Sequence, residues 1–206
     1  MSGWSVLSVA QARAIDQDAA ERLQMPTVLL MENAARSVAE IARTLGDRFV
    51  ILAGAGNNGG DALAAARHLG QQRCAVHLLA EPSPRSPDAV LQLRILRAAG
   101  WHVVVGELPD LAAHRGAVWI DGLFGTGLDR EVTGAARAWI EAFARASGPK
   151  VCIDIPSGLH GDTGDVLGVA CSADVTVTFV APKVGMTTPS GLAHCGRIVV
   201  VGLGLP

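Results

Sequence analysis

The sequence has no run of basic residues and no long apolar run. Its 17 basic and 19 acidic residues give a net charge of −2, so the positive surface of a nucleic-acid-binding protein is missing. No stretch approaches the ~18 apolar residues of a membrane-spanning helix. The first residues, MSGWSVLSVAQARA, lack the positively charged start of a secretory signal. We therefore expect a soluble, cytoplasmic protein that binds neither nucleic acid nor membranes.

Paired cysteines, repeats and linkers are also absent from the sequence. The cysteines form no CxxC pair and mostly lie in or beside apolar, strand-like runs, which predicts buried, reduced thiols. They are Cys74, Cys152, Cys171 and Cys195. The stretch most like a linker, EPSPRSPD at 81–88, is too short to separate domains. Half of the 206 residues are apolar, which is enough for one well-buried core, so we expect a single domain over residues 1–206.

Seven short apolar runs alternate with helical segments along most of the chain. Continuous apolar runs are typical of parallel strands that helices cover on both faces. The order predicts an α/β fold, a Rossmann-like three-layer αβα sandwich with a mostly parallel sheet, and the common strand order 3-2-1-4-5. The expected strands begin at Phe49, Cys74, His102, Ala117, Val151, Val175 and Arg197, and helical composition covers 61–70, 87–99 and 133–146.

Two further helices are expected before the first strand. In the second, which starts at Pro26, apolar residues recur every three or four positions and so share one face. They are Met31, Ala34, Val38, Ile41 and Leu45. This face either covers the sheet or holds a second subunit, and the sequence leaves both possibilities open.

Three glycine-rich loops with acids or amides follow the expected first, fourth and fifth strands. They read GNNGGD, DGLFGTGLDRE and DIPSGLHGDTG. Taken singly, each is equally compatible with ordinary turn chemistry, because a lone G-x-G-x-x-G is a weak signal and Asp61 could simply cap its helix. Ligands of open α/β sheets bind beyond the carboxyl ends of the strands, where the strand order reverses. We therefore expect the three loops to form one ligand-binding crevice.

Two aspartates, Asp121 and Asp154, each end an apolar strand at this edge of the sheet. A buried carboxylate without a partner is costly, and a cation or a bound ligand would remove the cost. Asn58, Asp121 and Ser157 offer oxygen ligands with no cluster of cysteine and histidine, which favours an alkali or alkaline-earth ion over a transition metal. A network of ordered water is the alternative.

The successive motifs of the chain resemble those of the YjeF N-terminal family, the NAD(P)HX epimerases. The resemblance rests on AGAGNNGGDALAAARHL, DGLFGTGL, DIPSGLHGDTG and ADVTVTFVAPKVGM, with RAIDQDAA and MENAA in the opening helices. It covers the chain almost end to end. It implies a Rossmann-like fold that interconverts the R and S forms of NAD(P)HX, the hydrated form of NADH or NADPH, with one potassium ion per subunit.

The resemblance also implies a set of site residues. Potassium would be held by Asn58, Asp121 and Ser157. The residues implied to bind the hydrated cofactor, which is a substrate here, are Asn57, Asn58, Gly59, Gly60, Asp61, Gly125, Thr126, Gly127, Leu128, Asp129, Arg130, Glu131 and Asp154.

The chain departs from the family pattern in two places. Its first loop reads GGDALAAARHL where GGDGLVAARHL is commoner, and His160 stands where an acid or amide is usual. Neither change removes an implied ligand. We expect a homodimer, and we expect functional coupling to an ADP- or ATP-dependent NAD(P)HX dehydratase, to which many relatives are fused.

The substrate chemistry predicts a catalytic residue. The hydroxyl of NAD(P)HX lies on a carbon next to the ring nitrogen, so the nitrogen lone pair can expel it once an acid protonates it. Asp154 is our candidate for this proton transfer, because a carboxyl in a partly desolvated crevice can have a raised pKa. We expect Lys183 to be a surface residue rather than one that positions the substrate, and we assign no role to His77 or His102.

Two other functions compete with an isomerase. A nicotinamide-dependent dehydrogenase would use Glu81, at the end of the second strand, to bind the ribose. Against it, Asp61 would repel a pyrophosphate, and the loops DGLFGTG and DIPSG would have no task. The third possibility is a noncatalytic scaffold of the YjeF type, against which the intact loops argue.

Overall fold

The structure, a computed structural model that describes residues 6–206, contains one seven-stranded sheet in the order β3-β2-β1-β4-β5-β6-β7. Every neighbouring pair of strands is parallel. The predicted order of the first five strands is therefore confirmed. The strands are β1 (Phe49–Ala53), β2 (Cys74–Leu78), β3 (Val103–Val105), β4 (Val118–Gly122), β5 (Lys150–Ile153), β6 (Val175–Phe179) and β7 (Arg197–Val201).

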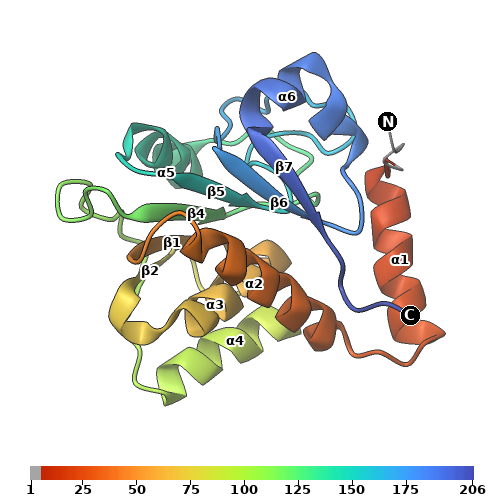
Figure 1. The fold of residues 1–206 in the computed structure, drawn as a ribbon, viewed down its shortest axis with the longest axis horizontal. Coiled ribbons are helices and arrows are strands. Elements are labelled where there is room, and N and C mark those ends of the chain that lie inside the picture. The colour runs from red at the N-terminus through yellow and green to blue at the C-terminus, as the bar shows by residue number, and fades with distance from the viewer. Residues whose placement is uncertain (1–5) are drawn as a thin grey trace.

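Helices lie on both faces of the sheet, as Figure 1 shows for α2, α3 and α4 on one side and α5 and α6 on the other. The predicted three-layer α/β architecture is thus confirmed. None of the helices in residues 6–206 is both long and apolar enough to span a membrane. The helices are α1 (Val9–Glu21), α2 (Thr27–Arg43), α3 (Asn57–Leu69), α4 (Pro87–Ala98), α5 (Gly134–Arg145) and α6 (Pro189–Cys195), with short 3₁₀ turns at Gln71–Arg73 and Val184–Thr187.

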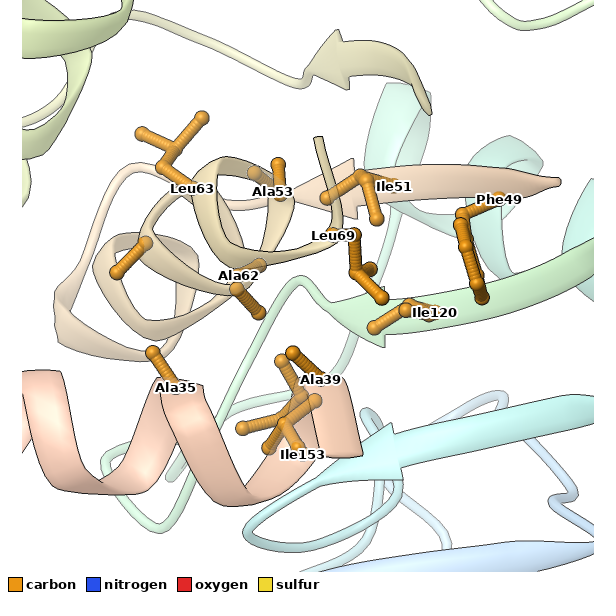
Figure 2. Packing of buried hydrophobic residues seen from close by; sticks show 14 of the residues in the cluster. Ala35, Ala39, Phe49, Ile51, Ala53, Ala62, Leu63, Leu69, Ile120 and Ile153 are labelled. Atoms are coloured by element: carbon orange, nitrogen blue, oxygen red, sulfur yellow. The ribbon is translucent and has the colours of Figure 1, made fainter. Parts of the chain in front are cut away.

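The central strand β1 is buried on both faces. Phe49, Ile51 and Ala53 pack in the core on the side of α2 and α3, and Figure 2 shows them beside side chains of these helices. The alternate residues Val50 and Leu52 belong to the core on the other side, with aromatic residues of α5. Because neither face of β1 meets solvent, polar and apolar residues need not alternate along it. This explains its continuous apolar run.

The apolar face predicted for α2 is buried within the chain. Met31 and Val38 join the core with residues of α3 and of the sheet, and Ala34 packs near Leu203. Ile41 and Leu45 are partly buried against the same core. Of the two possibilities that the sequence left open, this helix face covers the sheet.

Helix α3 begins at Asn57, about a turn before the predicted segment 61–70, so the NNGGD motif is helical rather than a loop. Its glycines are poor helix formers, which moves a propensity-based boundary toward the C-terminus. The fold overrides propensity because α3 lies very close to neighbouring backbone. A Cβ on Gly59 would lie 1.9 Å from the carbonyl oxygen of Gly54.

This close approach predicts a specific stability defect. We expect Gly59→Ala to destabilise the fold by about 1–3 kcal/mol, the usual range for overpacking, because the carbonyl of Gly54 cannot move as a side chain can. Gly56→Ala is the matched control, since a Cβ there meets nothing within 4 Å and its φ of −103° suits any residue. Urea unfolding measures both variants, and equal stability of the two would contradict the argument.

Candidate active site

A cavity of about 730 Å³ lies beyond the carboxyl ends of the central strands. Its volume falls within the range of about 300–1,000 Å³ that is typical of small-molecule sites. The lining comes from α1, the first turns of α3, the loop after β4 and the turns after β5 and β6. It includes most of the predicted substrate-binding residues: Asn57, Asn58, Asp61, Gly125, Thr126, Gly127, Leu128, Asp129, Arg130, Glu131 and Asp154.

The other two predicted substrate-binding residues, Gly59 and Gly60, are buried and lie outside this lining. Gly59 packs on Gly54, and a Cβ on Gly60 would lie 2.6 Å from the Cε of Met31. Their lack of a side chain lets α3 pack closely, which places the asparagines and Asp61 of the same motif at the cavity.

Asn58 has an unsatisfied buried side chain. The residue is 7% exposed, and neither the oxygen nor the nitrogen of its amide has a hydrogen-bond partner within residues 6–206. Buried amides without partners are rare because desolvation costs free energy that no contact recovers. A ligand bound to the Asn58 amide would remove this cost.

Asp121 and Ser157, the other two predicted cation ligands, are buried and bonded to each other. Oδ1 of Asp121 accepts from the Ser157 hydroxyl at 2.6 Å and from the Leu123 N–H at 3.1 Å, and Oδ2 accepts from the Ser157 N–H at 2.9 Å. The expectation of a carboxylate without compensation is therefore wrong, because these bonds satisfy it. The case for a cation rests instead on Asn58.

The three glycine-rich loops meet at Gly125. A Cβ added there would lie 3.2 Å from Oδ2 of Asp154 and 3.3 Å from Cγ of Asn58. In the same region, the hydroxyl of Ser157 accepts from the N–H of Phe124 at 2.8 Å. The loops after β1, β4 and β5 thus converge as predicted. The cation ligands expected from the sequence, Asn58, Asp121 and Ser157, offer oxygen atoms, the ligand type that hard cations take in proteins.

A second group that could hold a metal consists of Asp121, Cys152 and Cys171, whose ligand atoms lie within 4.8 Å of one another. Burial raises the pKa of Cys171 to about 12 and raises the pKa of Cys152 well above its usual range. Both thiols are therefore protonated, and the thiolate is the form that binds metal. All the cysteines are free, and each is buried except the half-buried Cys74, so the prediction of reduced, buried thiols is confirmed for the buried ones.

Lys183 is not the surface residue that the sequence led us to expect. It is 2% exposed, and its ammonium donates to Oδ1 of Asp154 at 2.5 Å and to Oγ1 of Thr178 at 3.0 Å. The expectation failed because lysines are usually exposed and a tertiary ion pair leaves no local signal. Here Lys183 precedes the 3₁₀ turn Val184–Thr187 and pairs in a β-bridge with Leu7, so the chain keeps it inside the cavity.

The turns after β5 and β6 have the same unusual backbone. Asp154 and Val180 both have a φ of 66°, a left-handed value that non-glycine residues seldom adopt. The N–H of Ile155 donates to the carbonyl of Ile153 and that of Ala181 to the carbonyl of Phe179, which makes each turn a strained γ-turn. Such strain costs of order 1–3 kcal/mol and clusters at functional sites.

The carboxyl groups around Lys183 outnumber it. Burial raises the pKa of Asp16, which lines the cavity from α1, and the neighbouring charge of Asp154 adds to the shift. Burial also raises the pKa of Asp61 well above its usual range, and Asp154, Asp16 and Asp88 act in the same direction while Lys183 opposes them. Asp16 and the nearby Arg13, which also lines the cavity, could not be predicted from the sequence, because nothing local indicates that α1 lies beside the sheet edge.

Comparison with known proteins shows which family the chain is similar to. The family model described as "YjeF-related protein N-terminus" matches residues 28–185. The chain is 37% identical to the NAD(P)H-hydrate epimerase of Rhodopirellula baltica, over 97% of this chain and 84% of that protein. It is 37% identical to the enzyme of the same name from Limosilactobacillus fermentum, over 94% of each chain.

Other relatives are longer. The chain is 38% identical to the bifunctional NAD(P)H-hydrate repair enzyme Nnr of Salinibacter ruber, over 98% of this chain but 41% of that protein. The crystal structure of yeast ynu0 (YNL200c) superimposes with a TM-score of 0.78 at 23% identity, over 96% of this chain and 88% of that chain, which supports the fold. From the family match and these identities, the chain belongs to the family of YjeF-related protein N-termini.

Proposed function

We propose that this protein interconverts the R and S forms of hydrated NADH and NADPH. The observation that carries the proposal is the ion pair between Asp154 and Lys183, which is nearly buried and lies at the cavity beyond the strand ends. Two relatives that this chain covers over most of their length are named NAD(P)H-hydrate epimerase. An acid–base group of this kind is what moving a hydroxyl from one face of a ring to the other requires.

The reaction is a loss and return of water at the carbon next to the ring nitrogen. Protonation lets the hydroxyl leave, the nitrogen lone pair forms a planar iminium, and water adds to either face. Asp154 is the proposed acid–base residue, and Lys183 is added to the proposed site because its ammonium donates a hydrogen bond to Asp154 at 2.5 Å and so orients the carboxylate. The two γ-turns at the strand ends orient the pair, since Asp154 and Val180 are cavity-lining residues in the same conformation.

Recognition of the dinucleotide falls to the rest of the lining. The N-terminus of α3 presents backbone N–H groups, which favour a negatively charged group, and Arg13 and Arg130 contribute positive charge to the cavity. The proposed substrate-binding set is the one that the family resemblance implies. Gly59 and Gly60 contribute to it through the packing of α3 rather than by lining the cavity.

Potassium would be held by Asn58, Asp121 and Ser157, one ion per subunit. The ion would supply a fixed positive charge that satisfies the Asn58 amide and orders the loops that meet at Gly125. We further propose a single cytoplasmic domain over residues 1–206 that forms a homodimer. Because bifunctional relatives are more than twice as long as the matched part, coupling to a dehydratase that consumes the S form belongs to the same proposal.

A dehydrogenase is a weaker candidate. Glu81, its expected ribose-binding acid, forms a two-bond ion pair with Arg97 through contacts of 2.5 and 3.1 Å. Glu81 is also absent from the lining of the large cavity. The carboxylate that would bind the ribose is thus paired with Arg97 instead.

The function itself is tested by recovery of NADH. We expect the purified protein, mixed with R-NADHX and an S-specific dehydratase, to convert the entire R form into NADH, measured by its absorbance. The control omits the protein, because the hydrate epimerises slowly unaided. NADH formation at the unaided rate would refute the epimerase proposal.

Asp154→Asn tests the acid–base residue. Asparagine keeps the size and an acceptor oxygen for the Lys183 ammonium, so we expect substrate affinity to be largely retained. Turnover should fall about 10²- to 10⁴-fold, the usual contribution of acid–base catalysis, or ~3–5 kcal/mol of barrier. Asp165→Asn, an exposed carboxylate of the same loop, is the control. Near-normal turnover of Asp154→Asn would show that Asp154 only binds substrate.

The cation proposal predicts a potassium-dependent stability. We expect potassium chloride to raise the unfolding temperature above that in choline chloride at equal ionic strength, and Asn58→Ala to remove most of this rise. At an ion concentration ten times the Kd, the linkage contributes about 1.4 kcal/mol. Asn57→Ala, an exposed neighbour in the same turn, should keep the response. A response identical in both variants would exclude Asn58 as a ligand.

A further inference from the structure

Epimerisation by loss and return of water makes a geometric demand that Asp154 alone does not meet. The hydroxyl leaves one face of the ring and needs a proton there, whereas the incoming water adds to the other face and must lose a proton there. A rigid side chain reaches one face. A reaction that runs in both directions therefore needs two groups that exchange the roles of acid and base. This requirement rests on the proposed function, and the structure supplies a second group.

The second group is Asp61. It lines the same cavity as Asp154 but comes from α3 rather than from the end of β5. Within residues 6–206 its carboxyl has neither a hydrogen-bond partner nor an ion-pair partner, whereas Asp154 is bonded to Lys183. A half-buried carboxyl without a protein partner is available to a substrate.

The charges that face Asp61 come from four elements. Asp16 lies on α1, Asp88 on α4, and Asp154 and Lys183 follow β5 and β6. Three acids and one base surround it, so burial and these neighbours favour its neutral form. Asp154 is instead paired with the adjacent ammonium of Lys183. Two carboxyls in one cavity thus have different environments, one paired with an ammonium and one without such a partner, and different environments are what separate an acid from a base.

We propose that Asp61 is a second catalytic acid–base residue and that it serves the face of the ring opposite to the Asp154–Lys183 pair. Asp61 donates its proton to the hydroxyl, the C–O bond breaks, and water leaves as the nitrogen lone pair completes the C=N bond. A water on the other side forms the new C–O bond as the C=N π electrons return to nitrogen, and it gives its proton to Asp154. Asp61 ends as the carboxylate and Asp154 as the acid. The reverse reaction starts from this state, and proton exchange with solvent restores the first.

The test is oxygen exchange in H₂¹⁸O, followed by mass spectrometry of each separated epimer. In the wild-type protein we expect label in both epimers together with inversion. In Asp61→Asn inversion should fall about 10²- to 10⁴-fold, while label still enters the one epimer whose hydroxyl faces Asp154. Asp154→Asn should label the opposite epimer only. The spontaneous rate is subtracted throughout.

The residual exchange shows that each variant folds and binds substrate. Asp61→Ser is a second variant without an acid, should the asparagine be poorly accommodated. Asp88→Asn is the matched control, because Asp88 faces Asp61 but lies outside the cavity lining and bonds to Thr27, and it should keep inversion within about twofold of the wild-type rate.

Three results decide the inference. The inference is supported if ¹⁸O enters one epimer in the Asp61 variants and the opposite epimer in the Asp154 variant. Inversion near the wild-type rate in both Asp61 variants overturns it, as does loss of exchange in both epimers by a variant that still binds substrate. A wild-type protein that neither inverts nor exchanges the hydroxyl refutes the proposed function and this inference together, so the two failures are distinguishable.

Discussion

Backbone packing between the first turn of α3 and the ends of β1 and β4 is the constraint on which the candidate site depends. A Cβ on Gly54 or on Gly59 would lie 1.9 Å from a neighbouring carbonyl oxygen, and one on Gly122 would lie 2.9 Å from that of Asn58. These contacts leave no room for side chains, so the helix start is fixed by backbone shape. The first and last glycines of the G-x-G-x-x-G pattern, Gly54 and Gly59, are thus explained by packing before any ligand is considered, and the asparagines and Asp61 are placed at the cavity as a result.

The electrostatics of the cavity follow from two strained strand ends. Adjacent strands β5 and β6 stop in equivalent γ-turns, which bring Asp154 and the segment leading to Lys183 to the same cavity. Burial of a lysine is costly unless it is paired and hydrogen-bonded, and Lys183 meets both conditions through Asp154 and Thr178. The ion pair therefore stabilises Lys183 in a buried position that would be unfavourable for an unpaired lysine.

Local patterns in the sequence predicted the architecture well and the site in part. Strand identity, parallel pairing and the apolar face of α2 depend on burial periodicity, which a sequence displays directly. The start of α3, the burial of Lys183 and the arrival of Asp16 at the cavity depend on which segments meet in space. A lysine after an apolar strand is the same in sequence whether it meets solvent or Asp154, so only the fold distinguishes the two. For the same reason, sequence reasoning foresaw the oxygens of Asp121 but not that Ser157 and Leu123 satisfy them.

The loop after β5 links the proposed cation site to the proposed chemistry. Asp154 and Ser157 lie within one short segment, so any ligand that fixes Ser157 also restricts the strained turn at Asp154. Gly125 forms a second link, since a Cβ added there would lie within 3.3 Å of side-chain atoms of both Asp154 and Asn58. An ion at Asn58 would therefore act on catalysis without touching the substrate, by reducing the freedom of a turn that stores strain.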